Sequence, residues 1–334
     1  MKVPNIPKWI LLAFVTMPLL TSCSKDNEND EEGQQAEQTK TIEWEVFHEF
    51  EAGETVTRFE ISDDAKWLFY TNAMGEAYRI NKTTGEKSLL YAHPLHYENG
   101  TLYLHVVRGN DSYFAVSDDF GTTRTEYHVG TYTNYAAGWF DGAFMNLIVN
   151  RMFVMPNGEL ILPHIMEKAN NATYLQDNFL IAVSSDGGAT WNRKESKPSS
   201  YISAQQGNRL FAISEGWTGV ENFESNLFYS DNGGTSWQES DLKYAPQAVD
   251  RENNLIAAGG NLIIKLKGGT WTTYTWEGET SFNDGPVFLN GLKYGGITGN
   301  DPNGRKMDDI EFDAGNNIYV IGRNSGTICR AKLD

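Results

Sequence analysis

The octet Ser184-Ser185-Asp186-Gly187-Gly188-Ala189-Thr190-Trp191 is the stretch of this chain that decides its fold. An acid and hydroxyl side chains at this spacing can hydrogen-bond within their own turn, and Gly188 permits the positive φ that a tight turn requires. Trp191 supplies a large apolar ring, which we expect to wedge between neighbouring sheets. The octet therefore predicts a tight turn that follows a β-strand.

Two further octets repeat this pattern, which can be written Ser-x-Asp-x-Gly-x-Thr-Trp. The octet from Ser230 to Trp237 has Asn for Asp and Ser for Thr, and the octet from Ser117 to Arg124 has Arg in place of Trp. We expect the fixed positions to be structural, because their side chains hold the turns together. These positions are Ser117, Asp119, Gly121, Thr123, Ser184, Asp186, Gly188, Thr190, Trp191, Ser230, Asn232, Gly234, Ser236 and Trp237.

The octets lie within a larger repeat. Six times, a turn of Gly, Asn or Asp leads at once into an apolar, β-prone run, which is the pattern of a hairpin entering a strand. These runs are residues 64–69, 99–104, 157–162, 207–212, 252–257 and 315–320. Repeats of this kind predict similar β-hairpin units along the chain.

On these octets and this repeat, residues 41–334 resemble the Asp-box (BNR-repeat) β-propellers, a group that includes sialidases, sortilin-like receptors and photosystem assembly factors. We therefore expect an all-β, six-bladed β-propeller of four-stranded antiparallel blades, with a seventh blade in residues 278–305 as the alternative. The last repeat supplies only three strands, so we expect the strand-like residues 42–47 to complete it and close the ring. The resemblance also implies that the Asp-box turns lie opposite the functional face.

The N-terminal segment has the pattern of an export signal. Residues 1–22 carry Lys2 and Lys8, no acid, and an apolar run that is too short to span a membrane. The run ends in Leu20-Thr21-Ser22-Cys23, which is similar to a bacterial lipobox. We expect a lipoprotein signal peptide at 1–22 and acyl chains on Cys23 that hold the protein to a membrane. The alternative is an ordinary secretory signal followed by a chance cysteine.

Residues 23–40 are rich in acids and poor in apolar side chains. Such a segment cannot bury enough surface to fold, so we expect a solvated, disordered tether before a propeller at 41–334. Acids directly after a lipidated Cys resemble the export signal of surface lipoproteins in Bacteroidota, and the alternative is a spacer without specificity. The expected location is the outer membrane at the cell surface, and the periplasmic face of that membrane is the alternative.

Charge, cysteine content and missing motifs argue against several classes of partner and site. The chain has 27 Lys and Arg against 44 Asp and Glu, a formal charge of −17, which argues against a nucleic-acid partner. Of its two cysteines, Cys23 is assigned to lipid, and we expect Cys329 to be a small buried strand residue without a disulfide. The sequence has no dinucleotide or phosphate-binding fingerprint and indicates no cofactor, and the spacing of His93, His96 and His105 does not indicate a metal site.

Four segments are longer than tight turns: residues 130–142, 166–177, 215–225 and 277–305. By the order of the repeat, all four should emerge opposite the Asp-box turns, where loops on a rigid scaffold commonly build a binding site. Their aromatic rings could stack on pyranose faces and their acids could accept sugar hydroxyls; the alternative is ordinary packing at blade ends. The candidate ligand-binding residues are Tyr132, Trp139, Asp141, His164, Glu167, Glu215, Trp217, Glu221 and Asp284.

Two functional hypotheses follow. Sialidase activity is disfavoured, because the Arg-Ile-Pro element implied by the resemblance is absent around Arg151 and Pro156 and because an acidic mouth would repel an anionic substrate. We favour a lipid-anchored, non-catalytic module that binds a glycan or an envelope protein. The alternative is a glycoside hydrolase on neutral glycans that uses a pair of loop carboxylates.

Overall fold

The computed structural model describes residues 37–109, 111–131, 152–166, 179–195, 200–217, 223–259, 262–275, 289–290, 293–294, 307–322 and 326–334. Within these ranges every regular element is a β-strand. None of the described residues forms a helix that is long and apolar enough to cross a membrane. Residues Gln35–Asp334 make one compact unit.

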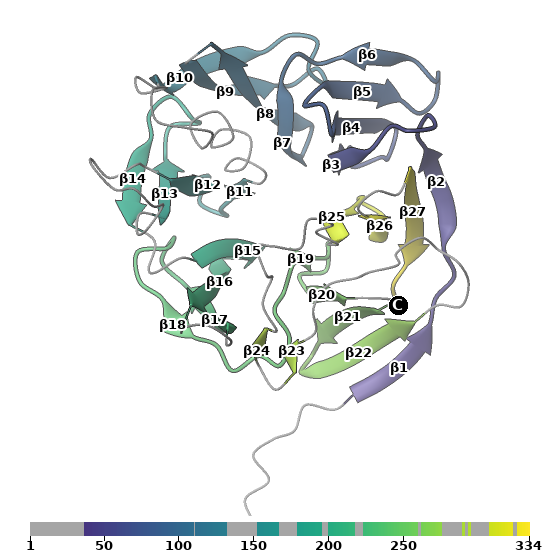
Figure 1. Cartoon of the computed structure of the whole chain (residues 1–334), viewed down its shortest axis with the longest axis vertical. Helices are drawn as coiled ribbons and strands as arrows, with labels where there is room; N and C mark the ends of the chain where they lie inside the picture. The colour runs from purple at the N-terminus through teal and green to yellow at the C-terminus, as the bar shows by residue number, and fades with distance from the viewer. Residues whose placement is uncertain are drawn as a thin grey trace, which may run out of the picture. The chain divides into compact units, whose positions relative to one another are not determined.

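Six four-stranded blades form the ring in Figure 1, which confirms the predicted all-β, six-bladed β-propeller. Blade 1 consists of β3 (Val56–Ile61), β4 (Trp67–Asn72), β5 (Ala77–Asn81) and β6 (Lys87–Leu89). Blade 2 consists of β7 (His93–Glu98), β8 (Thr101–Arg108), β9 (Asp111–Ser117) and β10 (Thr125–Thr131). Blade 3 consists of β11 (Phe153–Val154), β12 (Leu160–Met166), β13 (Phe179–Ser184) and β14 (Asn192–Glu195). Blade 4 consists of β15 (Ser200–Gln206), β16 (Arg209–Trp217), β17 (Phe223–Ser230) and β18 (Gln238–Glu239). Blade 5 consists of β19 (Ala248–Val249), β20 (Leu255–Gly259), β21 (Leu262–Lys267) and β22 (Thr270–Thr275). Blade 6 consists of β25 (Met307–Phe312), β26 (Asn317–Gly322), β27 (Thr327–Lys332) and β2 (Glu45–Glu49).

The ring is closed by an N-terminal strand. β2 pairs antiparallel with β27, with Val46 opposite Cys329, and so supplies the outermost strand of blade 6. The Phe47 ring packs edge-on against Tyr319 at 4.8 Å. The predicted closing strand at 42–47 is therefore present, although it begins at Glu45.

The last residues of the tether expected at 23–40 belong to a strand of the fold. β1 (Glu37–Thr41) pairs in parallel with β22 as a fifth strand of blade 5. Composition misses this strand because the pairing is made by backbone groups, which any polar sequence supplies. Ile42, which follows β1, is buried in the core between blades 5 and 6 and fixes the end of the strand.

The seventh blade is not formed by the described part of residues 278–305. There the chain makes only one short pair, β23 (Leu289–Asn290) with β24 (Lys293–Tyr294), and β24 lies against β17 of blade 4. Six blades are thus complete without it.

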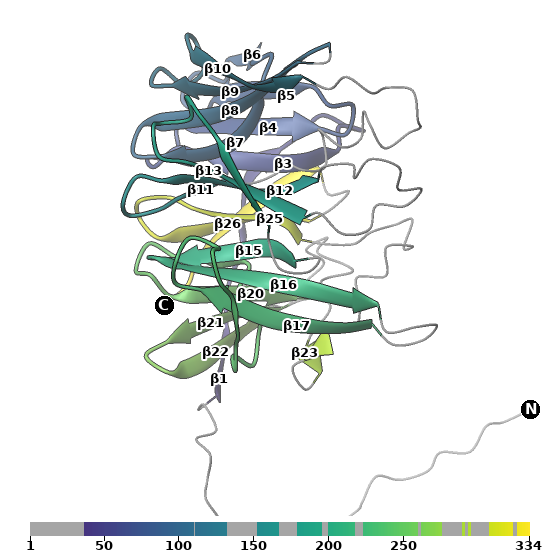
Figure 2. The same cartoon turned by 90° about the vertical axis from the view of Figure 1, so that its left-hand side faces the viewer.

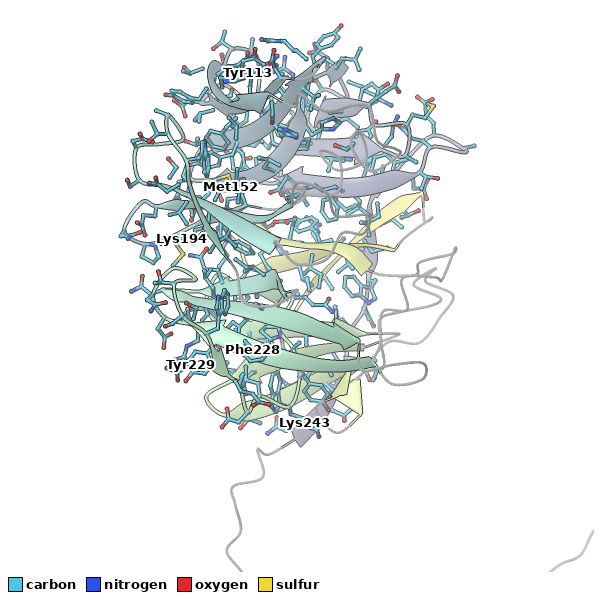
Figure 3. The ribbon with its side chains drawn as sticks, turned by 60° about the vertical axis from the view of Figure 1, so that its left-hand side comes forward. Tyr113, Met152, Lys194, Phe228, Tyr229 and Lys243 are labelled. Atoms are coloured by element: carbon cyan, nitrogen blue, oxygen red, sulfur yellow. The ribbon has the colours of Figure 1, made fainter. Side chains whose placement is uncertain are left out.

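The hydrophobic core lies between the blades. Each of the six junctions between neighbouring blades holds a cluster of buried side chains contributed by both sheets. Between blades 2 and 3, for example, Met152, labelled in Figure 3, is buried together with Phe114 and Leu162. Cys329 is buried between blades 5 and 6 as a free thiol, and burial raises the pKa of that thiol. No single sheet can bury its faces alone, so ring closure and core formation are coupled.

Strand order defines two faces of the ring. Each blade runs outward from its innermost strand, so the connections from first to second and from third to fourth strand share one face, which we call the turn face. Connections from second to third strand and from blade to blade share the opposite face, which we call the loop face. Figure 2 shows β12 and β16 with their arrowheads on the same side of the ring, as this order requires.

Candidate functional site

The three octets occupy equivalent turns on the turn face and make the same hydrogen bonds. In the octet of blade 3, the Asp186 carboxylate accepts bonds from the Thr190 hydroxyl at 2.6 Å, the Thr190 amide at 2.8 Å and the Ser184 hydroxyl at 2.8 Å. These bonds lower the pKa of Asp186 to about 2. Asp119 is bonded to Thr123 and Ser117 in the same way, and its pKa is also about 2.

Asn232 serves in place of the acid in the octet of blade 4. Its side-chain oxygen accepts from the Ser236 amide at 2.9 Å, while its amide nitrogen donates to the Ser236 hydroxyl at 2.8 Å. Exchanging Asp for Asn therefore preserves the turn, since one acceptor is simply replaced by a donor. The side chains at the fixed polar positions of these three turns are thus bonded within their own turns.

The glycine at the fifth position of the octets in blades 3 and 4 lies against the preceding blade. A Cβ at Gly188 would lie 2.2 Å from the Phe114 ring, and a Cβ at Gly234 would lie 2.3 Å from Ile181. The octet tryptophans pack into the same junctions: the Trp191 ring meets Phe114 edge-on at 5.1 Å, and Trp237 packs against the core between blades 3 and 4. Where Arg124 replaces tryptophan, its guanidinium donates to the Leu90 carbonyl at 2.9 Å. The octets thus join blades together.

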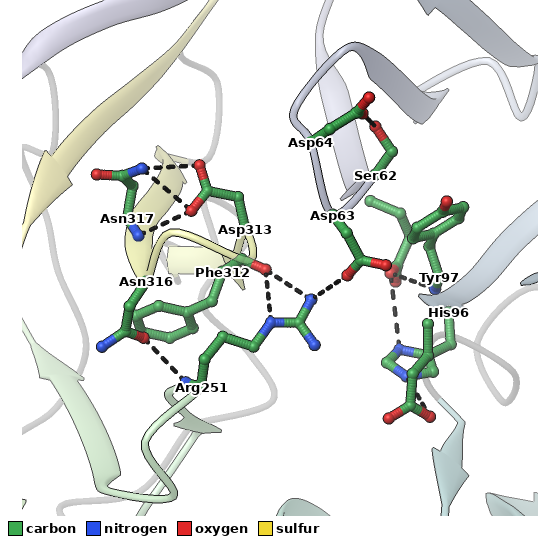
Figure 4. A network of polar contacts seen from close by, with 12 residues as sticks. Ser62, Asp63, Asp64, His96, Tyr97, Arg251, Phe312, Asp313, Asn316 and Asn317 are labelled. Atoms are coloured by element: carbon green, nitrogen blue, oxygen red, sulfur yellow. Dashed lines mark hydrogen bonds and ion pairs between the residues drawn. The ribbon is translucent and has the colours of Figure 1, made fainter. Parts of the chain in front are cut away.

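A second polar cluster on the turn face links blades 5, 6 and 1 (Figure 4). The Arg251 guanidinium donates to Asp63 at 2.9 Å and to the Phe312 carbonyl at 2.9 Å. The Arg251 backbone amide donates to Asn316, and the Ala314 amide donates to the Asp63 carbonyl. Because these groups satisfy one another across three blades, we assign the cluster a structural role and call it the Arg251 clasp.

The innermost strands of blades 1 and 2 also share a buried charge. Glu60 on β3 accepts from Arg58 at 2.5 Å and from the Tyr97 backbone amide at 3.0 Å. His96 lies 3.7 Å from the same carboxylate, and Arg58 also donates to the Leu95 carbonyl. A buried carboxylate with a guanidinium and a backbone donor is compensated in place, so this group holds two blades together.

Two of the histidines, His93 and His105, lie near each other, and His105 is bonded to a serine. His105 and Ser112 are both buried, and the His105 Nε2 lies 2.8 Å from the Ser112 hydroxyl. Burial, with a smaller contribution from His93, lowers the pKa of His105 to about 4. Within the described ranges, no group of three or more His, Cys, Asp or Glu side chains could hold a metal ion. The Ser–His contact is only 4% exposed at either residue, which closes it to a substrate.

Most of the sequence-predicted ligand residues lie outside the described residues: Tyr132, Trp139, Asp141, Glu167, Glu221 and Asp284, as does the lipidation candidate Cys23. For three other candidates the structure describes the backbone, which belongs to a β-strand in each case. His164 lies in β12, in the irregular stretch between Leu162 and Ile165, while Glu215 and Trp217 end β16 opposite Ser225 and Phe223. Strand order places these backbone positions toward the loop face of blades 3 and 4.

The described part of the loop face carries an apolar group that sequence analysis missed. Five large hydrophobic side chains are exposed within the described ranges, and four of them lie at the loop-face ends of blades 1 and 2. We call these four residues the blade 1–2 patch: Met74, Leu89, Tyr91 and Val107. The fifth, Val46, lies on β2 in blade 6. The patch is contributed by short connections, so loop length gave no signal for it.

Tyr91 is the prominent residue of this patch. It is 76% exposed, with buried Leu90 and Ala92 on either side. Its φ of 55° lies in the left-handed region, which costs a bulky L-residue roughly 1–2 kcal/mol. The neighbours hold this conformation, since Leu90 donates its amide to the Ala77 carbonyl at 2.9 Å. The backbone strain therefore coincides with an aromatic ring presented to solvent.

Several solved structures are similar to this chain in fold. The β-propeller domain of the Trilobed protease from Pyrococcus furiosus is 12% identical with a TM-score of 0.40, over 84% of this chain and 80% of that one. YCF48 from Cyanidioschyzon merolae is 13% identical with a TM-score of 0.44, over 86% and 98%. The GH74 xyloglucanase from Xanthomonas campestris is 12% identical with a TM-score of 0.45, over 86% of this chain and 53% of that one. No protein-family model and no curated protein matches the sequence.

Proposed function

We propose that this protein is a lipid-anchored β-propeller of the cell envelope that binds a glycan or a protein through its loop face without catalysing a reaction. The N-terminal sequence pattern supports the anchor and the location, and the three octets support the Asp-box resemblance. Strand order and exposed side chains support the loop face as the binding face.

One observation carries the choice of face. Of the described large hydrophobic side chains that are exposed, four of five gather at the loop face. Large apolar side chains that concentrate on one face of a folded protein support that face as an interaction surface. The turn face offers the opposite situation, because its polar groups are bonded within the octets and the Arg251 clasp. A ligand there would have to break existing bonds before it could make new ones.

Substitution of the loop-face tryptophans tests this proposal. In residues 35–334, Trp139→Ala and Trp217→Ala should strongly weaken retention of host and plant glycans or envelope proteins, because stacking rings contribute most of the contact energy in such sites. Single carboxylate changes, such as Glu215→Gln, should weaken it mildly. Arg209→Ala on the turn face is the matched control and should have no effect. The loop face would be the wrong face if both tryptophan variants retained every ligand.

The hydrolase alternative predicts a different pattern for the same variants. One loop carboxylate change would abolish turnover while ligand retention persisted, because a catalytic carboxylate acts on the transition state and adds little to binding.

A further inference from the structure

We infer that His48 is a proton-sensitive latch on β2, the strand that closes the ring. The neutral imidazole holds a lysine of blade 1 against β2, and protonation of the imidazole releases that lysine and loosens the strand. This inference goes beyond the proposed function, because it concerns the closure of the ring and does not depend on which ligand the loop face binds.

The lysine in question, Lys82, holds β2 through contacts of three kinds. Its ammonium lies 3.0 Å from the His48 Nδ1, donates to the Phe47 carbonyl at 3.1 Å and lies 4.8 Å from the centre of the Phe47 ring. Lys82 is itself fixed in blade 1, because its backbone amide donates to the Lys66 carbonyl at 2.7 Å. These contacts join the closing strand of blade 6 to blade 1.

The contact between Lys82 and His48 determines the protonation state of the imidazole. A lysine ammonium has three donors and no acceptor, so the Nδ1 of His48 is the acceptor. The imidazole is therefore neutral and carries its proton on Nε2. Protonation would add an N–H at Nδ1 that faces the ammonium, so two donors and two positive charges would meet. Because like charges at this separation repel strongly, the contact cannot persist once His48 is protonated.

The surroundings of His48 oppose a second positive charge. Burial is the largest cause of its lowered pKa, which is about 4, and the charge of Lys82 is the next. Burial lowers the pKa of Lys82 as well. The site therefore holds one cation at a cost, and a second cation adds repulsion to that cost.

The other charged groups around this histidine do not reverse the effect. Lys87 also lowers the pKa of the imidazole and Glu54 raises it, and these two side chains are paired with each other at 3.2 Å. On β2 itself, Glu45 is paired with Arg330 of β27 at 2.6 Å, and Glu49 is exposed. The imidazole is thus kept neutral well below the pH at which a free histidine titrates.

Loosening of β2 would extend to the loop face. β2 leads into the connection to blade 1, where the His48 ring meets Phe50 edge-on at 4.5 Å and Phe50 packs against Tyr70 at 4.9 Å. The Phe50 amide donates to the Gly326 carbonyl at 2.7 Å, and Glu54 accepts from the Tyr70 hydroxyl at 2.8 Å. Movement of His48 therefore disturbs the contacts between blades 6 and 1 along this connection.

Hydrogen exchange of the β2 amides in the full chain tests the inference. Exchange protection, corrected for the intrinsic pH dependence of exchange, should fall about twentyfold between about pH 7 and about pH 5. The reason is that His48 titrates near 4 while the strand is closed and near 6.5 when it is open, so acid favours the open strand.

Three variants isolate the latch. His48→Gln keeps an acceptor for Lys82 but cannot be protonated, so its β2 protection should change less than about twofold over the same pH range. Lys82→Met removes the donor, and should lower β2 protection at about pH 7 and reduce the pH effect, because burial is then the main term that opposes protonation. His105→Gln removes the other histidine whose pKa burial lowers to about 4, and should leave the β2 effect unchanged because the opening is local.

The ring nitrogens of His48 give a second readout, which does not depend on stability. Their NMR chemical shifts should show the Nε2–H tautomer at about pH 7. The Nδ1–H tautomer could not accept from Lys82 and would overturn the inference. An equal loss of β2 protection in His48→Gln and the wild type would also overturn it. Removal of the loss by His105→Gln would do the same, because β2 would then exchange only when the whole chain unfolds.

Discussion

At the scale of single residues, the octet glycines illustrate how one position meets two demands. Gly187 and Gly188 both have positive φ, at 69° and 96°. Only Gly188 also faces a neighbour, since a Cβ there would meet Phe114, whereas a Cβ at Gly187 meets nothing within 4 Å. The octet pattern fixes the second glycine because both the turn and the junction between blades require it.

This pair gives a matched prediction. Gly187→Ala should lower the free energy of unfolding by about 1 kcal/mol through backbone strain alone. Gly188→Ala should lower it by roughly 2–4 kcal/mol, because overpacking against Phe114 adds to the strain. Urea unfolding of both variants measures the difference, and equal losses would show that Phe114 moves aside freely.

Histidine burial predicts how stability depends on pH. Unfolded histidine titrates at about 6.5, whereas the pKa of His105 is about 4 in the fold. Between these values the unfolded chain binds a proton that the folded chain does not. The free energy of unfolding therefore decreases as the pH falls below about 6.5, and the contribution of this histidine to the decrease is complete near pH 4. His48 acts in the same direction, because burial and the nearby Lys82 lower its pKa to about 4.

The test of this prediction compares urea midpoints at about pH 7 and pH 5, where His105 should contribute a loss of roughly 2 kcal/mol. His105→Gln should remove that part of the loss. An unchanged slope in His105→Gln would contradict the assignment.

At the scale of elements, the two N-terminal strands have different roles. β2 is a full member of blade 6 and buries Phe47 against Tyr319. β1 adds to the outer edge of blade 5, and its described side chains, residues 38–41, are exposed or only partly buried. Ring closure should therefore depend on β2 and hardly on β1.

Two truncations test this difference. A chain that begins at Ile42 lacks only β1 and should lose about 1 kcal/mol or less. A chain that begins at Phe50 also lacks β2, which leaves β27 as an open edge and uncovers the junction between blades 6 and 1, so it should unfold at a much lower temperature and aggregate. Thermal unfolding of both chains measures this, and equal stability would show that the ring does not need its closing strand.

The positions of the strands follow from the sequence more directly than the exposed side chains do. The six hairpin starts each lead into the second strand of a blade, because a turn and an alternating strand are local properties of the chain. β1 was missed, because its pairing with β22 is long-range and uses no distinctive side chain. Tyr91 was missed for a similar reason: its exposure depends on a backbone conformation set by its neighbours, and no motif encodes that. Of the predicted ligand residues, the structure places only the backbones of His164, Glu215 and Trp217.

At the scale of the whole molecule, the Arg251 clasp is a second closure besides β2. It joins turns that are far apart in sequence, with Asp63 in blade 1 and Arg251 in blade 5, and both side chains are about one-third exposed, at 30% and 35%. Arg251→Ala should lower the free energy of unfolding by roughly 1–2 kcal/mol, since it frees the Phe312 carbonyl and Asp63 together. Lys267→Ala breaks the exposed pair with Glu252, which solvent screens, and should cost much less. Equal effects in urea unfolding would mean that the clasp adds nothing to closure.

We expect the loop face to bind its ligand without turning it over. The direct measurement is to incubate residues 35–334 with a pool of host and plant glycans and to examine the free and protein-bound fractions by mass spectrometry. We expect that the lengths of the glycans in the pool stay unchanged. New, shorter species would contradict it and would assign the loop carboxylates, Asp141, Glu167, Glu215, Glu221 and Asp284, to hydrolysis.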